Sequence, residues 1–176
     1  MNVQKISSAN TSINKTKLPT AFKKFDLLIK GKHICDYGCG KYTSHIRDHV
    51  CENGGLSYNP YDPYNMPELE NYITEQTGIL HGFDLIFCCN VLNVIDNDDT
   101  INEIVRHMIH WLNYRGNIII QIYEGDKTGI IKETKKDCIQ RNMKTECYFN
   151  IIKPIVENSH MKISRVGNYI IIGNIV

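Results

Sequence analysis

The sequence predicts an α/β domain in which helices cover both faces of a mostly parallel sheet. Short apolar runs alternate with segments whose apolar residues recur at helical spacing. The run Phe83–Cys89 is almost continuously apolar, as expected of a parallel strand that is buried on both faces. Two further apolar runs, 162–166 and 169–176, are joined by Gly167 and Asn168, a hairpin turn signal. The predicted architecture is therefore a three-layer α-β-α sandwich that ends in an antiparallel hairpin.

The other elements follow in order along the chain. A loose polar arm over residues 1–15 precedes a single domain over 16–176, because 176 residues make one domain by size. Strands are expected at 32–36, at 56–59 or 56–61, and at 83–89, 117–123, 162–166 and 169–176. Helices are expected at 19–29, 41–51, 68–76, 101–115 and, in two pieces interrupted by Pro154, at 132–158. Residues 63–82 contain no clear strand, although Ile79 and Leu80 offer a fragment.

Composition excludes several classes of protein. Hydrophobic residues make up 42% and charged residues 22% of the chain, and no apolar run approaches the ~20 residues that span a bilayer. The N-terminus has no apolar signal-peptide core, so a cytoplasmic location is expected, in a cell or in a virus-infected host cell. Seven cysteines without a Cys-x-x-Cys pattern indicate reduced thiols. His107 and His110 are spaced three apart, but no further ligand has matching spacing, so no metal is expected.

Charge is distributed unevenly along the chain. Residues 1–32 carry seven lysines and one acid, residues 48–126 carry thirteen acids and two arginines, and residues 127–144 carry six bases and two acids. Such runs are often only solvated faces. They also suit weak contact with nucleic acid at a basic rim formed by Lys15, Lys17, Lys135 and Lys136, and both interpretations stay open.

The segment Asp36-Tyr37-Gly38-Cys39-Gly40-Lys41 follows the first predicted strand and precedes a helix. Its two glycines allow a sharp turn that leaves backbone N–H groups open to a ligand. A strand, a glycine turn and a helix form the place where α/β sheets bind nucleotide-like cofactors. The acid stands before the glycines, so the segment differs from the Gly-x-Gly-x-x-Gly fingerprint of dinucleotide-binding proteins.

This Asp-x-Gly-x-Gly segment resembles the cofactor loop of class I S-adenosylmethionine (SAM) dependent methyltransferases. Phe83-Asp84-Leu85-Ile86, followed by the apolar segment 91–95, resembles a second motif of that family. Together the two segments look similar to methyltransferases associated with DNA phosphorothioation and to their phage-like relatives. The resemblance implies a Rossmann-like sheet and SAM as cofactor. It implies cofactor contacts from Asp36, Tyr37, Gly38, Cys39, Gly40, Asn90 and Val91, with Asn90 and Asn93 as catalytic candidates.

Two positions depart from the family pattern. The acid that accepts hydrogen bonds from the ribose of SAM falls, by its usual distance, on Asn59, and Asp62 takes this place if the turn is longer. The third glycine of the loop is replaced by Tyr42, which either crowds the methionine end of SAM or stacks on a ligand. Asn59-Pro60-Tyr61 also resembles the Asn-Pro-Pro-Tyr motif of DNA adenine methyltransferases, but it lacks the second proline and follows the wrong strand.

Three functions are compatible with these motifs. The first is methyl transfer from SAM by direct displacement to an unidentified acceptor, either a nucleic acid or a small molecule, which needs alignment but no metal. The second is a non-catalytic SAM-fold module that binds a partner, favoured by the departures at Asn59 and Tyr42. The third is a phage-type enzyme that degrades SAM.

Overall fold

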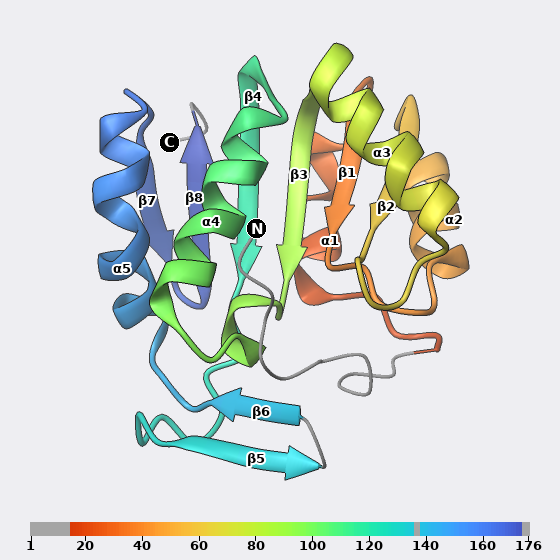
Figure 1. Ribbon diagram of the computed structural model, residues 1–176. Coiled ribbons are helices and arrows are strands. Elements are labelled where there is room, and N and C mark those ends of the chain that lie inside the picture. Colours follow the sequence, from red (N-terminus) through yellow and green to blue (C-terminus); the bar gives the residue numbers. More distant parts are fainter. Residues whose placement is uncertain (1–14, 136–137, 174–176) are drawn as a thin grey trace.

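The computed structural model describes residues 15–135 and 138–173, and these form one six-stranded sheet with the order β2-β1-β3-β4-β8-β7 (Figure 1). Its strands are β1 (His33–Tyr37), β2 (Ser57–Tyr61), β3 (Phe83–Cys89), β4 (Leu112–Gln121), β7 (Ile163–Val166) and β8 (Tyr169–Gly173). Strands β2, β1, β3 and β4 run parallel, and β8 is antiparallel to both of its neighbours. The predicted mostly parallel sheet with a C-terminal antiparallel hairpin is confirmed.

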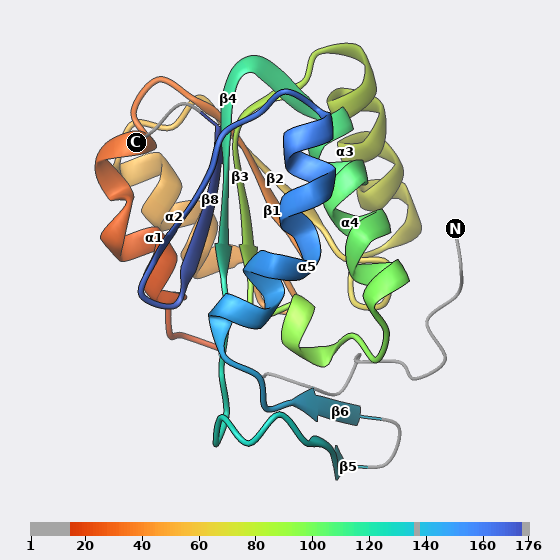
Figure 2. The same cartoon turned by 90° about the vertical axis from the view of Figure 1, so that its left-hand side faces the viewer.

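Helices cover both faces of this sheet, as Figure 2 shows. One face carries α1 (Thr20–Lys24), the short 3-10 turn η1 (Asp26–Leu28) and α2 (Ser44–Glu52). The other carries α3 (Glu68–Leu80), α4 (Asp98–His110) and α5 (Thr145–Asn158), with a second 3-10 turn, η2 (Leu92–Val94), before α4. No helix in the described part of the chain is long and apolar enough to cross a membrane.

Each face has its own apolar core. On the α1–α2 side, the ring of Phe22 stacks on that of Phe87 with centroids 4.0 Å apart. On the α3–α5 side, Trp111 is fully buried and its ring lies 5.0 Å from that of Tyr61. Because side chains alternate along a strand, the neighbouring residues Asp36 and Tyr37 at the end of β1 point to opposite cores.

The sequence of β2, the outermost strand, disfavours pairing of this edge with a further strand. Pro60 has no N–H to offer another strand, and its carbonyl accepts a hydrogen bond from Thr74 Oγ1 of α3 at 2.8 Å. The fragment at Ile79 and Leu80, offered by the sequence as a strand, is instead the end of α3. Helix α3 therefore satisfies the outward carbonyl of Pro60 at this edge, and β3 follows it along the chain.

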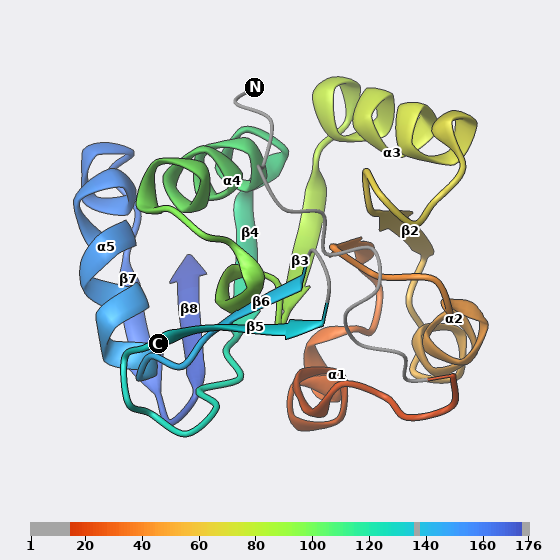
Figure 3. The same cartoon turned by 60° about the horizontal axis from the view of Figure 1, so that its bottom comes forward.

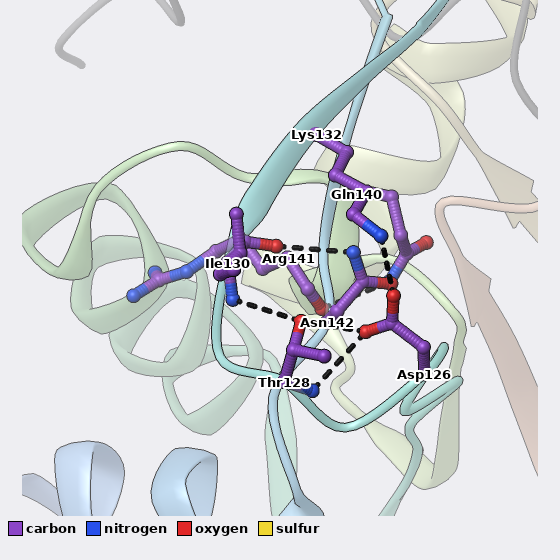
Figure 4. Close-up of polar contacts among 7 residues, drawn as sticks. All are labelled: Asp126, Thr128, Ile130, Lys132, Gln140, Arg141 and Asn142. Atoms are coloured by element: carbon purple, nitrogen blue, oxygen red, sulfur yellow. Dashed lines mark hydrogen bonds and ion pairs between the residues drawn. The ribbon is translucent and has the colours of Figure 1, made fainter.

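The largest departure from the predicted elements is a hairpin where the first piece of the 132–158 helix was expected. Strands β5 (Ile131–Lys135) and β6 (Cys138–Arg141) pair antiparallel and lie across the carboxyl edge of the large sheet (Figures 1 and 3). Asp126 accepts hydrogen bonds from Thr128, and Asn142 donates to the carbonyl of Ile130 at 3.0 Å (Figure 4). The pairing of β5 with β6 and the contact between Asn142 and Ile130 override the helical propensity of the Lys- and Glu-rich run.

Two helix boundaries also differ from expectation. The helix expected to reach residue 115 ends at His110, because Trp111 is buried in the core and its carbonyl accepts the N–H of Phe83 at 2.8 Å. Residues from Leu112 onward then belong to β4. Pro154 does not interrupt α5, whose neighbouring residues Ile152 and Val156 are both buried against the core.

Candidate functional site

A cavity of about 320 Å³ opens at the carboxyl ends of β1, β2 and β3. Five segments line it: the loop after β1, the turn after β2, the segment after β3, one face of α4, and the chain just before α1. Its walls and floor include Lys17, Asp36, Tyr37, Gly38, Cys39, Gly40, Lys41, Tyr42, His45, Tyr61, Asp62, Tyr64, Asn65, Asn90, Val91, Ile104 and His107. The carboxyl edge of parallel strands is where α/β sheets bind their ligands.

The glycine loop is folded tightly against its neighbours. Gly38 and Gly40 have φ angles of 76° and 74°, the left-handed region that favours glycine. A Cβ on Gly38 would lie 2.2 Å from Val91 Cγ2, whereas one on Gly40 would meet nothing within 4 Å. Two independent features thus require glycine at position 38. Its φ angle is unfavourable for other residues, and Val91 in the segment after β3 leaves no room for a Cβ.

The backbone N–H groups of Gly38, Cys39 and Gly40 in this loop are not open to a ligand, contrary to the expectation from the sequence. Those of Gly38 and Cys39 donate to the carbonyl of Tyr61 at 2.7 and 3.2 Å, and that of Gly40 donates to Asp62 Oδ2 at 3.0 Å. The loop is therefore bound to the end of β2. Burial raises the pKa of the Cys39 thiol, so this side chain stays protonated in the cavity.

Asp62 organises the turn after β2. Its carboxylate accepts four hydrogen bonds, from the backbone N–H groups of Gly40, Tyr64 and Asn65 and from the side-chain amide of Asn65. An ionised carboxylate has about four lone-pair sites. Asp62 therefore lines the cavity but uses its hydrogen-bonding capacity within the protein, where it joins the glycine loop to the turn.

Asp36 lies at the end of β1 and is 2% exposed. Its Oδ2 accepts the hydroxyl of Tyr58 at 2.8 Å. Burial disfavours the charged form and raises the pKa of Asp36 to about 7, although the bond from Tyr58 opposes the shift. Asp36 therefore changes its charge near neutral pH, in the floor of the cavity.

His107 of α4 reaches the cavity from the opposite core. One ring nitrogen, Nδ1, lies 3.0 Å from the hydroxyl of Tyr37, and its ring packs against that of Trp111 with centroids 4.1 Å apart. Burial lowers the pKa of His107 to about 4, with a smaller contribution from His110. The imidazole is therefore neutral at pH 7, and together with Tyr37 and Tyr61 it forms an aromatic wall.

Asn90 follows β3 and takes a left-handed conformation with φ of 59°, which is uncommon for a residue other than glycine. Its backbone N–H donates to the carbonyl of Gln121 at 2.8 Å, and its side-chain Oδ1 accepts from Gln121 Nε2 at 3.3 Å. Gln121 at the end of β4 thus fixes both the backbone and the side chain of Asn90.

The structure brings most of the predicted site residues together. All of the predicted cofactor residues line the cavity except Asn59, whose amide donates to the carbonyl of Ile34 and to the hydroxyl of Ser57. This orientation also leaves Asn59 unable to hold a target amine as in the Asn-Pro-Pro-Tyr motif. Of the two catalytic candidates, Asn90 lines the cavity, whereas Asn93 is buried beneath the small hairpin and donates to Gln140 Oε1 at 3.1 Å.

Among the cavity residues that the sequence did not predict, two carry buried polar atoms without a partner. Asn65 Oδ1 and His45 Nδ1 are buried atoms without a hydrogen-bond partner, and both residues line the cavity. Buried polar atoms are nearly always paired, so these two mark places where a ligand can supply the partner. A signal was available for Asn65, because it lies three residues beyond Asp62 within the same polar turn.

The predicted basic rim lies only partly within the described residues. Lys17 lines the cavity, and Lys15 Nζ is 5.5 Å from the ring centroid of Tyr42, which also lines it. Lys136 and the side chain of Lys135 lie outside the described residues. In the second basic block, Lys127 pairs with Glu124 and Lys132 pairs with Asp126. Among the described residues, no group of three or more His, Cys, Asp or Glu side chains is arranged to hold a metal ion.

Solved structures of methyltransferases share this fold. An O-methyltransferase family protein from Burkholderia thailandensis has a TM-score of 0.54 and 10% identity over 86% of this chain and 55% of its own. The 1,6-didemethyltoxoflavin-N1-methyltransferase of the same organism, solved with S-adenosylhomocysteine, has a TM-score of 0.58 and 13% identity over 85% and 72%. The N-methyltransferase NodS from Bradyrhizobium japonicum has a TM-score of 0.50 and 12% identity over 88% and 90%.

No family model and no curated protein sequence matches the chain. At 10–13% identity, the structural likenesses show the fold, which is the Rossmann-like fold of SAM-dependent methyltransferases. They lend no support to the narrower resemblance to phosphorothioation-associated enzymes, which stays a prediction from the motifs.

Proposed function

We propose that this protein is a SAM-dependent methyltransferase. The observation that carries the proposal is the cavity itself, in which the loop after β1, the turn after β2 and the segment after β3 meet around two buried polar atoms that lack partners. The fold and the Asp-x-Gly-x-Gly loop support the same cofactor. Bound SAM supplies an electrophilic methyl group on a sulfonium.

The residues of the cavity fit such a cofactor. Asp36 offers a carboxylate to the ammonium of the methionine part, and the raised pKa of Asp36 falls back when a cation lies beside it. Asn65 Oδ1 is an acceptor without a partner and suits a ribose hydroxyl. The aromatic wall of Tyr37, Tyr61 and His107 gives the cavity an apolar surface that suits a purine.

In this proposal Asp62 is a positioning residue, because its four accepted hydrogen bonds hold the glycine loop and the turn in place. Asn59 takes no part in binding. The protein's contribution to the rate is alignment of the acceptor with the methyl carbon and sulfur, a kind of catalysis that requires neither a metal nor a covalent intermediate.

Calorimetric titration of SAM into the protein and into two matched variants tests the site. Asn65→Leu removes the acceptor in the cavity. Asn102→Leu removes an equally buried and unpartnered Asn oxygen on α4 that does not line the cavity. We expect wild type and Asn102→Leu to bind SAM alike, and Asn65→Leu to bind about tenfold more weakly, as for one lost hydrogen bond of about 1.4 kcal/mol. No heat with any of the three proteins would contradict the proposal.

Incubation with labelled SAM separates the alternatives. Transfer of label to pools of nucleic acid, protein or small molecules supports a methyltransferase. Breakdown of SAM without an acceptor indicates a SAM-degrading enzyme, and binding without either reaction indicates a non-catalytic module. Contact with nucleic acid at the basic rim is tested by gel shift over increasing salt, comparing wild type with the Lys15/Lys17/Lys135/Lys136→Glu variant, since phosphate contacts weaken steeply with salt.

A further inference from the structure

Asn90 is held in one orientation by a chain of hydrogen bonds that begins at a backbone N–H. The N–H of Ala21 donates to Gln121 Oε1 at 2.8 Å, and Thr20 Oγ1 donates to the same oxygen at 3.1 Å. A backbone N–H can only donate, so Gln121 must turn its carbonyl oxygen toward Ala21. Its NH₂ group then points to Asn90 and can only donate there. Asn90 must therefore turn its Oδ1 toward Gln121 and its Nδ2 away from it.

The backbone N–H of Ala21 in α1 thus fixes which side-chain amide atom of Asn90 is Oδ1 and which is Nδ2. Gln121 is 7% exposed, so water has little access to compete for its amide. The backbone of Asn90 is fixed as well, by its left-handed conformation and its bond to the carbonyl of Gln121. Asn90 Nδ2 has no hydrogen-bond partner in the part of the chain that the structure describes, and the residue lines the cavity. Asn90 Nδ2 is consequently a hydrogen-bond donor that remains available to a ligand in the cavity.

Positive charge accompanies this donor. Lys17 precedes α1 and lines the same cavity, and Lys41 at the end of the glycine loop lines it too. Three acids, Asp36, Asp62 and Glu103, line the cavity as well. Asp62 accepts four hydrogen bonds, and burial raises the pKa of Asp36 to about 7. A donor in a cavity that two lysines also line suits an anionic group of oxygen atoms.

We propose that the methyl acceptor is a carboxylate, with one oxygen bonded to Asn90 Nδ2 and the other attacking the methyl group; this rests on the methyltransferase function proposed above. In the transfer, the attacking oxygen forms a bond to the methyl carbon, the bond from that carbon to sulfur breaks, and sulfur keeps the electron pair. The products are a methyl ester and a neutral thioether. No proton has to be removed, because a carboxylate is already ionised at neutral pH.

An amine acceptor would need the opposite polarity. Its N–H groups would have to donate to an oxygen at this position, and Gln121 turns that oxygen of Asn90 away. The Asn90→Asp variant reverses the polarity without disturbing the neighbour, because one carboxylate oxygen can still accept from Gln121 Nε2 while the other faces the cavity. Asn158→Asp makes the same chemical change at an exposed position at the end of α5 and serves as the matched control.

The test uses acetate and methylammonium as probes of the full chain saturated with S-adenosylhomocysteine. We expect acetate to shift the side-chain NH₂ signal of Asn90 in nuclear magnetic resonance spectra, saturably, and methylammonium to leave it unmoved. Asn90→Asp should weaken acetate binding at least tenfold, and Asn158→Asp should not. Equal acetate binding by wild type and Asn90→Asp, or a shift with methylammonium alone, would overturn the proposal.

Product chemistry gives an independent result. Label transferred from methyl-labelled SAM should be released by alkali as volatile methanol, as methyl esters are. Label that survives alkali would exclude a carboxylate acceptor while leaving methyl transfer intact. Failure of SAM to bind in calorimetry would instead remove the methyltransferase function, so the two failures are distinguishable.

Discussion

Replacing Gly38 with alanine should destabilise the protein much more than replacing Gly40, although both have almost the same φ angle. The two positions differ in what a new Cβ would meet. At Gly38 it would lie 2.2 Å from Val91 Cγ2, and at Gly40 it would meet nothing within 4 Å. The pair therefore separates the cost of a left-handed backbone from the cost of a steric clash.

The magnitudes follow from these two terms. A left-handed conformation costs a residue other than glycine about 1–2 kcal/mol. Forcing an extra carbon into a packed site costs about 1–3 kcal/mol more. We therefore expect the free energy of unfolding to fall by about 1–2 kcal/mol in Gly40→Ala and by about 2–5 kcal/mol in Gly38→Ala.

Removing the two Val91 methyl groups that clash with the new Cβ should recover the steric part of the lost stability. In Gly38→Ala combined with Val91→Ala, the two nearest of the three closest atoms are removed and the Val91 Cβ remains, at 3.4 Å from the new methyl group. Urea unfolding of the three single variants and the double variant measures this coupling, expected at about 1–3 kcal/mol. If Gly38→Ala and Gly40→Ala lose equal stability, or if the double variant shows additive losses, the close packing of the loop on Val91 is wrong.

Three further predictions concern the acids and the histidine of the cavity. Asp62→Ala leaves four donors without their acceptor and should lower the free energy of unfolding by about 2–4 kcal/mol in urea unfolding; a loss below about 0.5 kcal/mol would refute its role in the turn. Since the pKa of Asp36 is raised from 3.8 to about 7, wild type should lose stability relative to Asp36→Asn as pH rises from 4 to 7, by up to about 1.4 kcal/mol per unit, whereas parallel pH profiles would contradict this. His107 has its pKa lowered from 6.5 to about 4, so wild type should lose stability relative to His107→Gln as pH falls from 6.5 to 4, and a constant difference would contradict its burial as a neutral ring.

The strands were predictable from the sequence because their burial leaves a local signature. The strand β3 occupies the residues predicted for it, since a strand covered on both faces must be almost continuously apolar. The small hairpin leaves no such signature. It is held to the rest of the protein by Gln140, which accepts from Asn93 at 3.1 Å, and by Arg141, which pairs with Asp98 at 2.8 Å. These partners are more than forty residues away, so composition alone favoured a helix.

The candidate site was predictable only where it follows strand ends. Asp36, the glycine loop and Asn90 each come directly after or at the end of a parallel strand, so the topology alone brings them to one edge. His107 reaches the cavity from inside a helix, and its position depends on how α4 packs. Asn59 was expected at the ribose because family spacing places the end of β2 there, but β2 continues to Tyr61 and the turn is formed by Asp62.

The end of β1 links the cavity to both cores of the protein. Asp36 turns toward α2 and is held by Tyr58, whereas its neighbour Tyr37 turns toward α4 and is held by His107. Substitutions that repack the α1–α2 core are therefore expected to shift Asp36, and those that repack the α3–α5 core to shift its neighbour Tyr37. Asp36 and His107 both take up a proton on acidification, but burial raises the pKa of Asp36 and lowers that of His107. Acidification from pH 7 to pH 4 therefore first neutralises Asp36 on one side of the strand and then begins to charge His107 on the other. A cationic cofactor that needs the Asp36 carboxylate should consequently bind more weakly as the pH falls below 7, by up to about tenfold per unit, and Asp36→Asn should remove that dependence in calorimetric titrations. An unchanged pH dependence in this variant would place the cationic group elsewhere in the cavity.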